Sequence, residues 1–172
     1  EEDFVRTLFV ANSHDTILCF SNSGKVYWIK VYQLPQAGRH ARGRPLINLL
    51  PLGENERITA FLRLGDCLPG HYVFMATRNG TVKKCSISSF SRPRSVGLRA
   101  IELLDGDELV AADVTTGSSD VLLFASSGKA IRFSEKDVRE MGRTARGVRG
   151  MTLKPNQKVI SLITVEPGVI GY

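Results

Sequence analysis

The segment Arg39-His40-Ala41-Arg42-Gly43-Arg44 returns later in the chain as a near copy, Arg143-Thr144-Ala145-Arg146-Gly147-Val148-Arg149-Gly150. Before each copy lies an apolar run with a turn glycine, and the distance from that turn glycine to the glycine of the basic segment is the same in both copies. The middle of the chain holds a looser copy with Arg92, Arg94, Gly97 and Arg99. An internal repeat of this length is typical of propellers and solenoids.

Each repeat has the same predicted order of strands. Two β-prone runs joined by a glycine turn form a hairpin, and Asn79-Gly80 is among the strongest such turn signals. A basic loop follows, then a third strand, a polar turn and a fourth strand. The expected hairpin strands are 16–20 with 25–31, 71–76 with 81–87, and 120–125 with 129–133; the expected third strands are 46–52, 100–104 and 150–153; and the fourth are 57–62, 108–114 and 158–164.

Two other segments have their own signals. Residues 4–11 are rich in β-branched and aromatic residues and predict a strand before the first hairpin. Residues 135–141 predict a single helical turn capped by Ser134, because acidic residues follow the cap.

The fold expected is therefore all-β, a propeller-like array of four-stranded blades in which each blade covers its neighbour's apolar face. One domain over residues 1–172 is expected, with repeats at about 4–62, 63–114 and 115–172, since no linker divides the chain. The 42% hydrophobic content is that of an ordinary soluble globular protein. The chain begins without Met or an apolar leader and has no run able to span a bilayer, so we expect a piece of a larger, non-membrane protein.

Charge is segregated along the chain rather than mixed. Residues 16–53, 67–101 and 141–165 contain no Asp or Glu, yet they hold most of the 23 lysines and arginines. Repeated in each unit, this segregation predicts one positive surface that meets an anionic partner. A solvated basic face without a partner is the alternative.

No catalytic or metal-binding motif is found. Cys19, Cys67 and Cys85 lack CxxC spacing, which favours a reducing compartment, and Cys19 is best interpreted as a small core residue. The three histidines are far apart and have no neighbours at metal-ligand spacing. We therefore expect no catalytic residue, no metal and no cofactor in this chain.

The basic loops remain as the candidate site. Guanidinium groups bind phosphate oxygens in bidentate fashion, and glycine lets backbone N–H groups approach the same phosphates. The loops lack the aromatic platform of single-strand and RNA readers, so duplex DNA held by its backbone fits better.

At these residues the sequence resembles the C-terminal domain of the DNA gyrase A subunit. The resemblance covers nearly the whole chain and rests on the segments 10–15, 18–20, 24–27, 31–35, 41–45, 74–84, 105–109 and 147–150. It implies a β-pinwheel, a disc whose blades exchange strands, of which about three blades of a larger disc are present here. The family's gyrase box is absent, and no tyrosine has the surroundings of the DNA-cleaving residue, which belongs to the N-terminal half of that protein.

The resemblance also implies a role for the domain. The domain would bend duplex DNA around a basic rim, in a cytoplasmic, nucleoid-associated bacterial enzyme that introduces negative supercoils. That enzyme is an A2B2 assembly, in which the N-terminal half of the gyrase A protein and the gyrase B protein would be the partners of this chain, with ATP and Mg²⁺ used outside it. The expected DNA-binding residues are Arg39, Arg42, Arg44, Lys83, Lys84, Arg92, Arg94, Arg99, Arg143, Arg146 and Arg149.

Three alternatives stay open from the sequence. The corresponding domain of topoisomerase IV has the same architecture, and a propeller could instead be a scaffold whose basic loops meet an acidic protein. An enzyme with its own active site in the disc has almost no support.

Overall fold

The computed structural model describes residues 10–43, 45, 48–64 and 69–168. Its elements are strands and short 3-10 turns: β1 (Thr16–Ser21), β2 (Lys25–Lys30), η1 (Val31–Gln33), β3 (Ile58–Arg63), β4 (Tyr72–Thr77), β5 (Thr81–Ser86), η3 (Ile87–Phe90), β6 (Leu98–Arg99), β7 (Leu109–Thr115), β8 (Asp120–Ala125), β9 (Ala130–Ser134), η4 (Glu135–Asp137), β10 (Val148–Arg149) and β11 (Val159–Val165). No helix among the described residues is long and apolar enough to cross a membrane.

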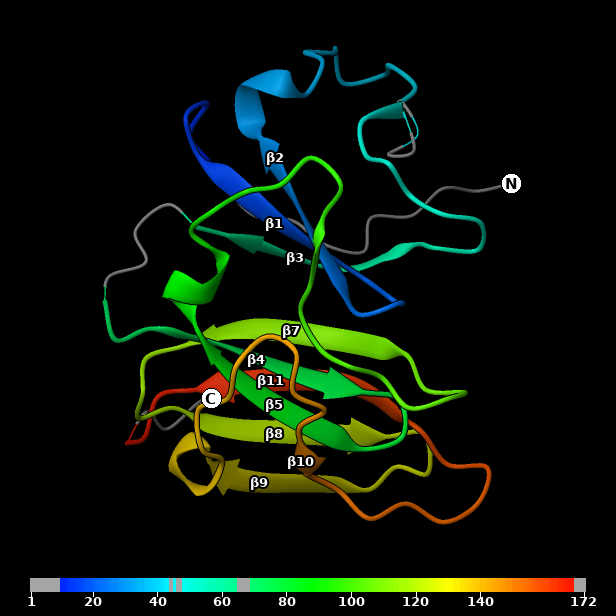
Figure 1. The fold of residues 1–172 in the computed structure, drawn as a ribbon, viewed down its shortest axis with the longest axis vertical. Helices are drawn as coiled ribbons and strands as arrows, with labels where there is room; N and C mark the ends of the chain where they lie inside the picture. The colour runs from blue at the N-terminus through cyan, green and yellow to red at the C-terminus, as the bar shows by residue number, and fades with distance from the viewer. Residues whose placement is uncertain (1–9, 44, 46–47, 65–68, 169–172) are drawn as a thin grey trace.

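The strands form three antiparallel sheets that follow one another down the molecule in Figure 1. The first sheet has the order β3-β1-β2-β6, the second has the order β10-β5-β4-β7, and the third consists of β11-β8-β9 among the described residues. The all-β pinwheel expectation is confirmed, as are the three hairpins and the strands at 58–63, 109–115 and 159–165.

The outermost strand of a sheet comes from the next repeat. Residues 98–99 pair with β2 of the first sheet, and residues 148–149 pair with β5 of the second. Each of these two sheets is therefore completed by chain that lies beyond its own hairpin. The blades exchange strands.

The expected third strands were wrong. No strand lies at 48–52, 100–104 or 150–153. Residues 48–50 form a turn, and the N–H groups of the residues that follow β6 and β10 donate to Gly24 and Gly80 instead of pairing along a strand. Two of the apolar residues that suggested those strands pack between blades, Ile101 in the first interface and Met151 in the second. Leu49 and Leu104 are exposed instead. Residues 4–9 of the expected first strand and residues 46–47 lie outside the described part of the chain.

Alternate residues of each strand face opposite neighbours, which produces one core per interface. Leu18 and Phe20 face the second sheet, whereas Phe74 and Ala76 of the second sheet face the third. Cys19 lies on the other face of the first sheet and is fully buried, as expected. The pKa of its thiol is raised to about 12 because burial disfavours the thiolate.

The short helical turn expected after Ser134 is confirmed as η4. The Ser134 side chain accepts a hydrogen bond from the backbone N–H of Lys136, as a cap does. The turn is shorter than the predicted span, since it ends at Asp137.

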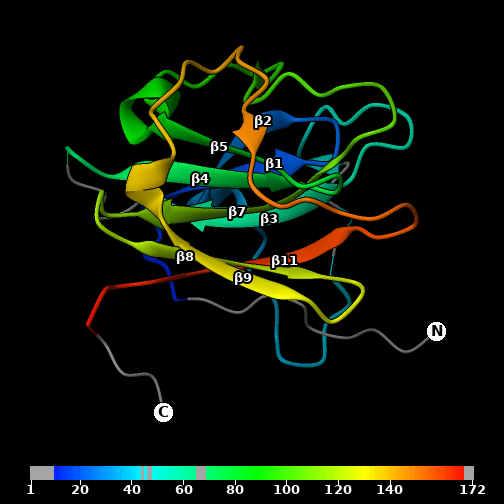
Figure 2. The ribbon, with the colours of Figure 1, turned by 90° about the horizontal axis from the view of Figure 1, so that it is seen from below.

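The order of strands distinguishes an inner and an outer edge of the blades. The strands β3, β7 and β11 end their sheets on one side, and β3 contacts β7 as β7 contacts β11. The exchanged strands β6 and β10 end theirs on the opposite side. In Figure 2, β2, β5 and β10 lie at the upper side, above β3 and β7.

Candidate nucleic-acid interface

The exchanged strands place two arginines at equivalent positions on the outer edge. Arg99 of β6 is paired with Lys25 of β2, and Arg149 of β10 is paired with Thr81 of β5. Both arginines are exposed. One arginine per blade interface therefore faces solvent at the same point of the repeat.

A glycine precedes each exchanged strand for a steric reason. Gly97 has a φ of +79° and Gly147 a φ of +95°, a region that L side chains rarely adopt. A Cβ atom on Gly97 would lie 2.7 Å from the Tyr27 ring, and one on Gly147 would lie 2.5 Å from the carbonyl oxygen of Val82. The glycines thus let the basic loops turn sharply onto the neighbouring blade.

Lys25 was not predicted from the sequence, and it belongs to this edge. It is exposed and directly opposite Arg99, so two positive side chains share one face of an antiparallel pair. Like charges in this arrangement destabilise the sheet unless an anion lies between or above them. The position of Lys25, immediately after the turn Gly24, is the sequence signal that could have identified it.

Most described arginines outside the basic loops pair with a carboxylate, whereas most of those inside the loops do not. Elsewhere, Arg57, Arg78 and Arg132 each lie within 4 Å of a carboxylate, for example Arg132 Nη2 at 2.7 Å from Asp120 Oδ2. Within the described residues, no carboxylate pairs with the exposed arginines of the loops: Arg39, Arg42, Arg92, Arg94, Arg99 and Arg149. These cations are therefore available to an external anion.

In the third basic loop, residues 142–149, some of the positive charge is buried or paired within the protein. Arg143 is half-buried. Arg146 is exposed, but its Nε lies 3.5 Å from Glu102 Oε2, and the Glu102 backbone N–H donates to the carbonyl oxygen of Ala145 at 3.2 Å. The loop is free of acids in sequence, yet the fold brings Glu102 to it from the crossing segment after β6.

The described part of the first basic loop, residues 38–43, follows η1 at the upper end of Figure 1. Its Arg39 and Arg42 are exposed, and Arg44 lies outside the described residues. The backbone N–H of Ala41 donates to the carbonyl oxygen of Gly38, as that of Ala145 does to Gly142 in the third loop. Whether Arg42 shares one continuous edge with Arg146 stays a prediction.

The assignment of Lys83 and Lys84 to DNA binding is corrected by their burial. Lys83 is fully buried, and its ammonium donates to the carbonyl oxygens of Ala100 at 2.8 Å and Arg143 at 2.5 Å. Burial lowers the pKa of Lys83. Both lysines lie on β5, an inner strand of the second sheet, and their side chains extend into the interfaces with the neighbouring blades. Neither ammonium group is therefore exposed to solvent.

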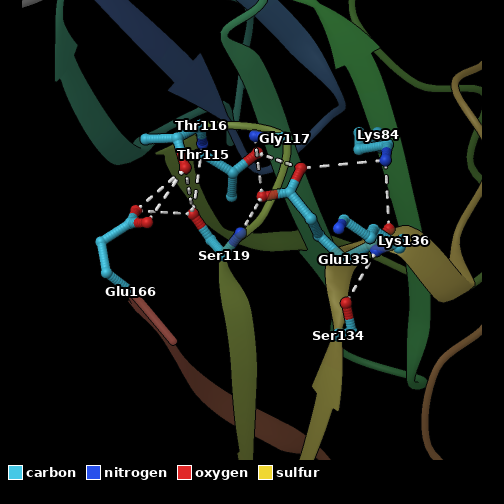
Figure 3. Close-up of polar contacts among 9 residues, drawn as sticks. All are labelled: Lys84, Thr115, Thr116, Gly117, Ser119, Ser134, Glu135, Lys136 and Glu166. Atoms are coloured by element: carbon cyan, nitrogen blue, oxygen red, sulfur yellow. Dashed lines mark hydrogen bonds and ion pairs between the residues drawn. The ribbon is translucent and has the colours of Figure 1, made fainter. Parts of the chain in front are cut away.

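Lys84 points to the other interface, where it meets Glu135 (Figure 3). Its Nζ donates to the backbone carbonyl of Glu135 at 3.1 Å, lies 3.8 Å from Glu135 Oε1 and stands 4.8 Å above the Tyr72 ring. The fully buried Glu135 carboxylate also accepts hydrogen bonds from Thr115 Oγ1 at 3.0 Å and from the backbone N–H of Ser119 at 2.7 Å. This cluster fastens η4 to the second sheet.

No group of three metal-ligating side chains gathers among the described residues. The chemistry that the arrangement offers is therefore charge and hydrogen-bond donation at the outer edge. A binding surface for a polyanion matches that chemistry.

The chain matches a known family along most of its length. A family model described as "DNA gyrase C-terminal domain, beta-propeller" matches residues 15–64, 71–116 and 119–166. The DNA gyrase A subunit of Salmonella typhimurium is 60% identical and that of Escherichia coli K12 is 56% identical, each over 163 residues. These matches cover 95% of this chain and 19% of each relative, so the chain spans about a fifth of their length.

Two solved structures share the fold over most of the chain. The crystal structure of the C-terminal domain of DNA topoisomerase IV superposes with a TM-score of 0.80 at 29% identity, covering 90% of this chain and 48% of that one. The DNA gyrase A C-terminal domain superposes with a TM-score of 0.76 at 26% identity, covering 90% and 49%.

Proposed function

Since this chain belongs to the DNA gyrase C-terminal domain family, we propose that it binds duplex DNA through the phosphate backbone and bends it along the outer edge of its blades. The arginines of the basic loops and Lys25 supply the positive charge. Because phosphates repeat along any duplex, binding is independent of base sequence.

One observation carries the proposal: Arg99 and Arg149 stand at equivalent places on successive blades, exposed and without an acidic partner among the described residues. A repeated cation at a repeated spacing suits a ligand that is itself a repeating polyanion. Glu108 and Asp120 pair instead with arginines outside the loops, and among the described loop arginines only Arg146 has a carboxylate partner. This separation argues against a basic face that serves solubility alone.

Within the whole enzyme, this binding would support negative supercoiling. The chain would guide DNA toward the cleaving centre in the N-terminal half of the gyrase A protein, while ATP and Mg²⁺ act with the gyrase B protein in an A2B2 assembly. The chain itself would perform no catalytic step. Identities of 56–60% to gyrase A subunits over 95% of this chain support gyrase as the parent enzyme.

A salt titration tests the proposal. The affinity of the chain for linear duplexes of two unrelated sequences is measured at several salt concentrations, for the parent, Arg99→Ala and Arg149→Ala. Each substitution should lower the slope of log K against log salt by about 0.9, equally on both duplexes, because one fewer counterion is released. Unchanged slopes would contradict the proposal, and a loss confined to one duplex would indicate base readout.

A further inference from the structure

We propose that Lys83 is a positioning residue that ties the second basic loop, residues 91–99, to the third, residues 142–149, so that the two bind DNA as one unit. The inference rests on the proposed function, and it gives a role to a lysine that cannot itself reach a phosphate.

The contacts of Lys83 join two segments that are far apart in sequence. Its Nζ donates to the carbonyl oxygen of Ala100, the residue after Arg99, and to the carbonyl oxygen of Arg143. Ala100 directly follows the second loop, and Arg143 stands near the start of the third. A single ammonium group, with no exposed surface, therefore holds the end of one loop against the beginning of the next.

The third loop has few other anchors before β10. The backbone N–H of Met141 donates to the carbonyl oxygen of Lys84, and Glu102 contacts the loop through Ala145 and Arg146. Glu102 belongs to the same crossing segment as Ala100. Lys83 thus holds both the segment that carries Glu102 and the loop that carries Arg146.

Arg149 is held differently. It pairs with Thr81 in β10, and the next residue, Gly150, donates its N–H to the carbonyl oxygen of Gly80 at 2.8 Å. Its position does not depend on Lys83. The third loop therefore contains one arginine whose placement requires Lys83 and one whose placement does not.

This difference defines a double-mutant cycle on DNA binding. Arg146→Ala and Arg149→Ala are each measured in the parent chain and in Lys83→Met, which keeps an apolar side chain of similar length but removes the donors. The readout is the salt slope on linear duplex DNA. We expect Arg146→Ala to lower the slope by about 0.9 in the parent and to have no further effect in Lys83→Met, whereas Arg149→Ala should lower it by about 0.9 in both.

A purely structural role of Lys83 predicts something else. It would lower the melting temperature and leave the effect of Arg146→Ala unchanged, and that additive result would overturn the inference. If neither arginine changes the slope in the parent chain, the proposed DNA contacts fail instead.

A second variant keeps the test decisive if Lys83→Met does not fold. Lys83→Gln retains two N–H donors on a shorter side chain and should preserve part of the Arg146 effect. Circular dichroism at the binding temperature selects the variants that are folded, and a full Arg146 effect in a folded variant without donors to both carbonyls would contradict the proposal.

Discussion

The backbone N–H of Gly150 donates to the carbonyl oxygen of Gly80 at 2.8 Å, and the N–H of Met151 donates to the same oxygen at 3.1 Å. One repeat earlier, Ala100 and Ile101 donate to Gly24 in the same way. The turn at the tip of each hairpin is thereby fastened to the crossing segment of the next repeat.

Gly147→Ala tests how far the exchanged strand depends on close backbone approach. A side chain at the positive φ of Gly147 costs about 1–2 kcal/mol in backbone strain. The added Cβ would also lie 2.5 Å from the Val82 carbonyl oxygen. Gly128→Ala is the matched control, because Gly128 has a φ of +83° but open space around it. Urea denaturation should show a larger loss of unfolding free energy for Gly147→Ala, and equal losses would show that β10 yields without strain.

Arg42→Ala and Arg146→Ala should each lower the salt slope of DNA binding by about 0.9, and the double variant by about twice that. Stability should change by no more than about 0.5 kcal/mol, since both side chains are exposed. Arg57→Ala, whose guanidinium pairs with Glu108, is the control and should leave the slope unchanged. If Arg42→Ala leaves the salt slope unchanged, the first basic loop does not contact the DNA.

Glu102→Gln should strengthen DNA binding. The Glu102 carboxylate lies 3.5 Å from the Arg146 guanidinium, so it competes with phosphate for that cation and repels the phosphate itself. An exposed pair of this kind is worth about 0.2–1 kcal/mol, which corresponds to a gain of at most about fivefold. Fluorescence anisotropy with labelled duplex measures the gain, and Glu108→Gln, which loses a carboxylate outside the basic loops, should not reproduce it.

Acid should destabilise the chain through Glu56. Burial alone would raise the pKa of this carboxyl, but hydrogen bonds from Ser21, Ser23, the Gly53 N–H and Tyr27 lower it to about 2 from an ordinary 4.5. A depressed folded pKa contributes stability above pH 4.5 that is lost as the pH falls toward 2. Thermal melts from pH 6 to pH 2 should therefore show a decline that is smaller in Glu56→Gln, whereas Glu54→Gln should decline like the parent.

Glu135→Ala should destabilise the chain by about 3–5 kcal/mol, because it leaves the Lys84 ammonium buried without its carboxylate. The hydrogen bonds to Thr115 and Ser119 are lost as well. Chemical denaturation measures the loss, with Lys136→Ala, an exposed neighbour, as the control. A change below about 1 kcal/mol would mean that water replaces the carboxylate.

The hairpins could be predicted from local sequence because their signals are local. Alternating apolar residues around a turn such as Asn79-Gly80 specify a two-stranded unit without reference to the rest of the chain. The same holds for Ser134, whose capping role depends only on the residues after it. The exchange of β6 and β10 has no such signal, since Leu98-Arg99 and Val148-Arg149 are too short to show a pattern.

The candidate site was predicted unevenly for a related reason. Exposure follows from sequence for loop arginines such as Arg92 and Arg94, which lie among turn residues. Lys83 and Lys84 look equally basic in sequence, and only the packing of blades shows that both ammonium groups are enclosed. Likewise Glu102 lies outside every basic segment, yet the crossing of the chain brings it to Arg146.

Strand exchange also determines when each blade can be finished during synthesis. The first sheet forms its hairpin by Lys30 but must wait for Leu98 to emerge before its fourth strand exists, and the second waits from Ser86 to Val148. Until then β2 and β5 present unpaired backbone groups, the kind of open edge at which nascent chains associate wrongly. Each of these two blades is therefore completed only after part of the following repeat has been synthesised.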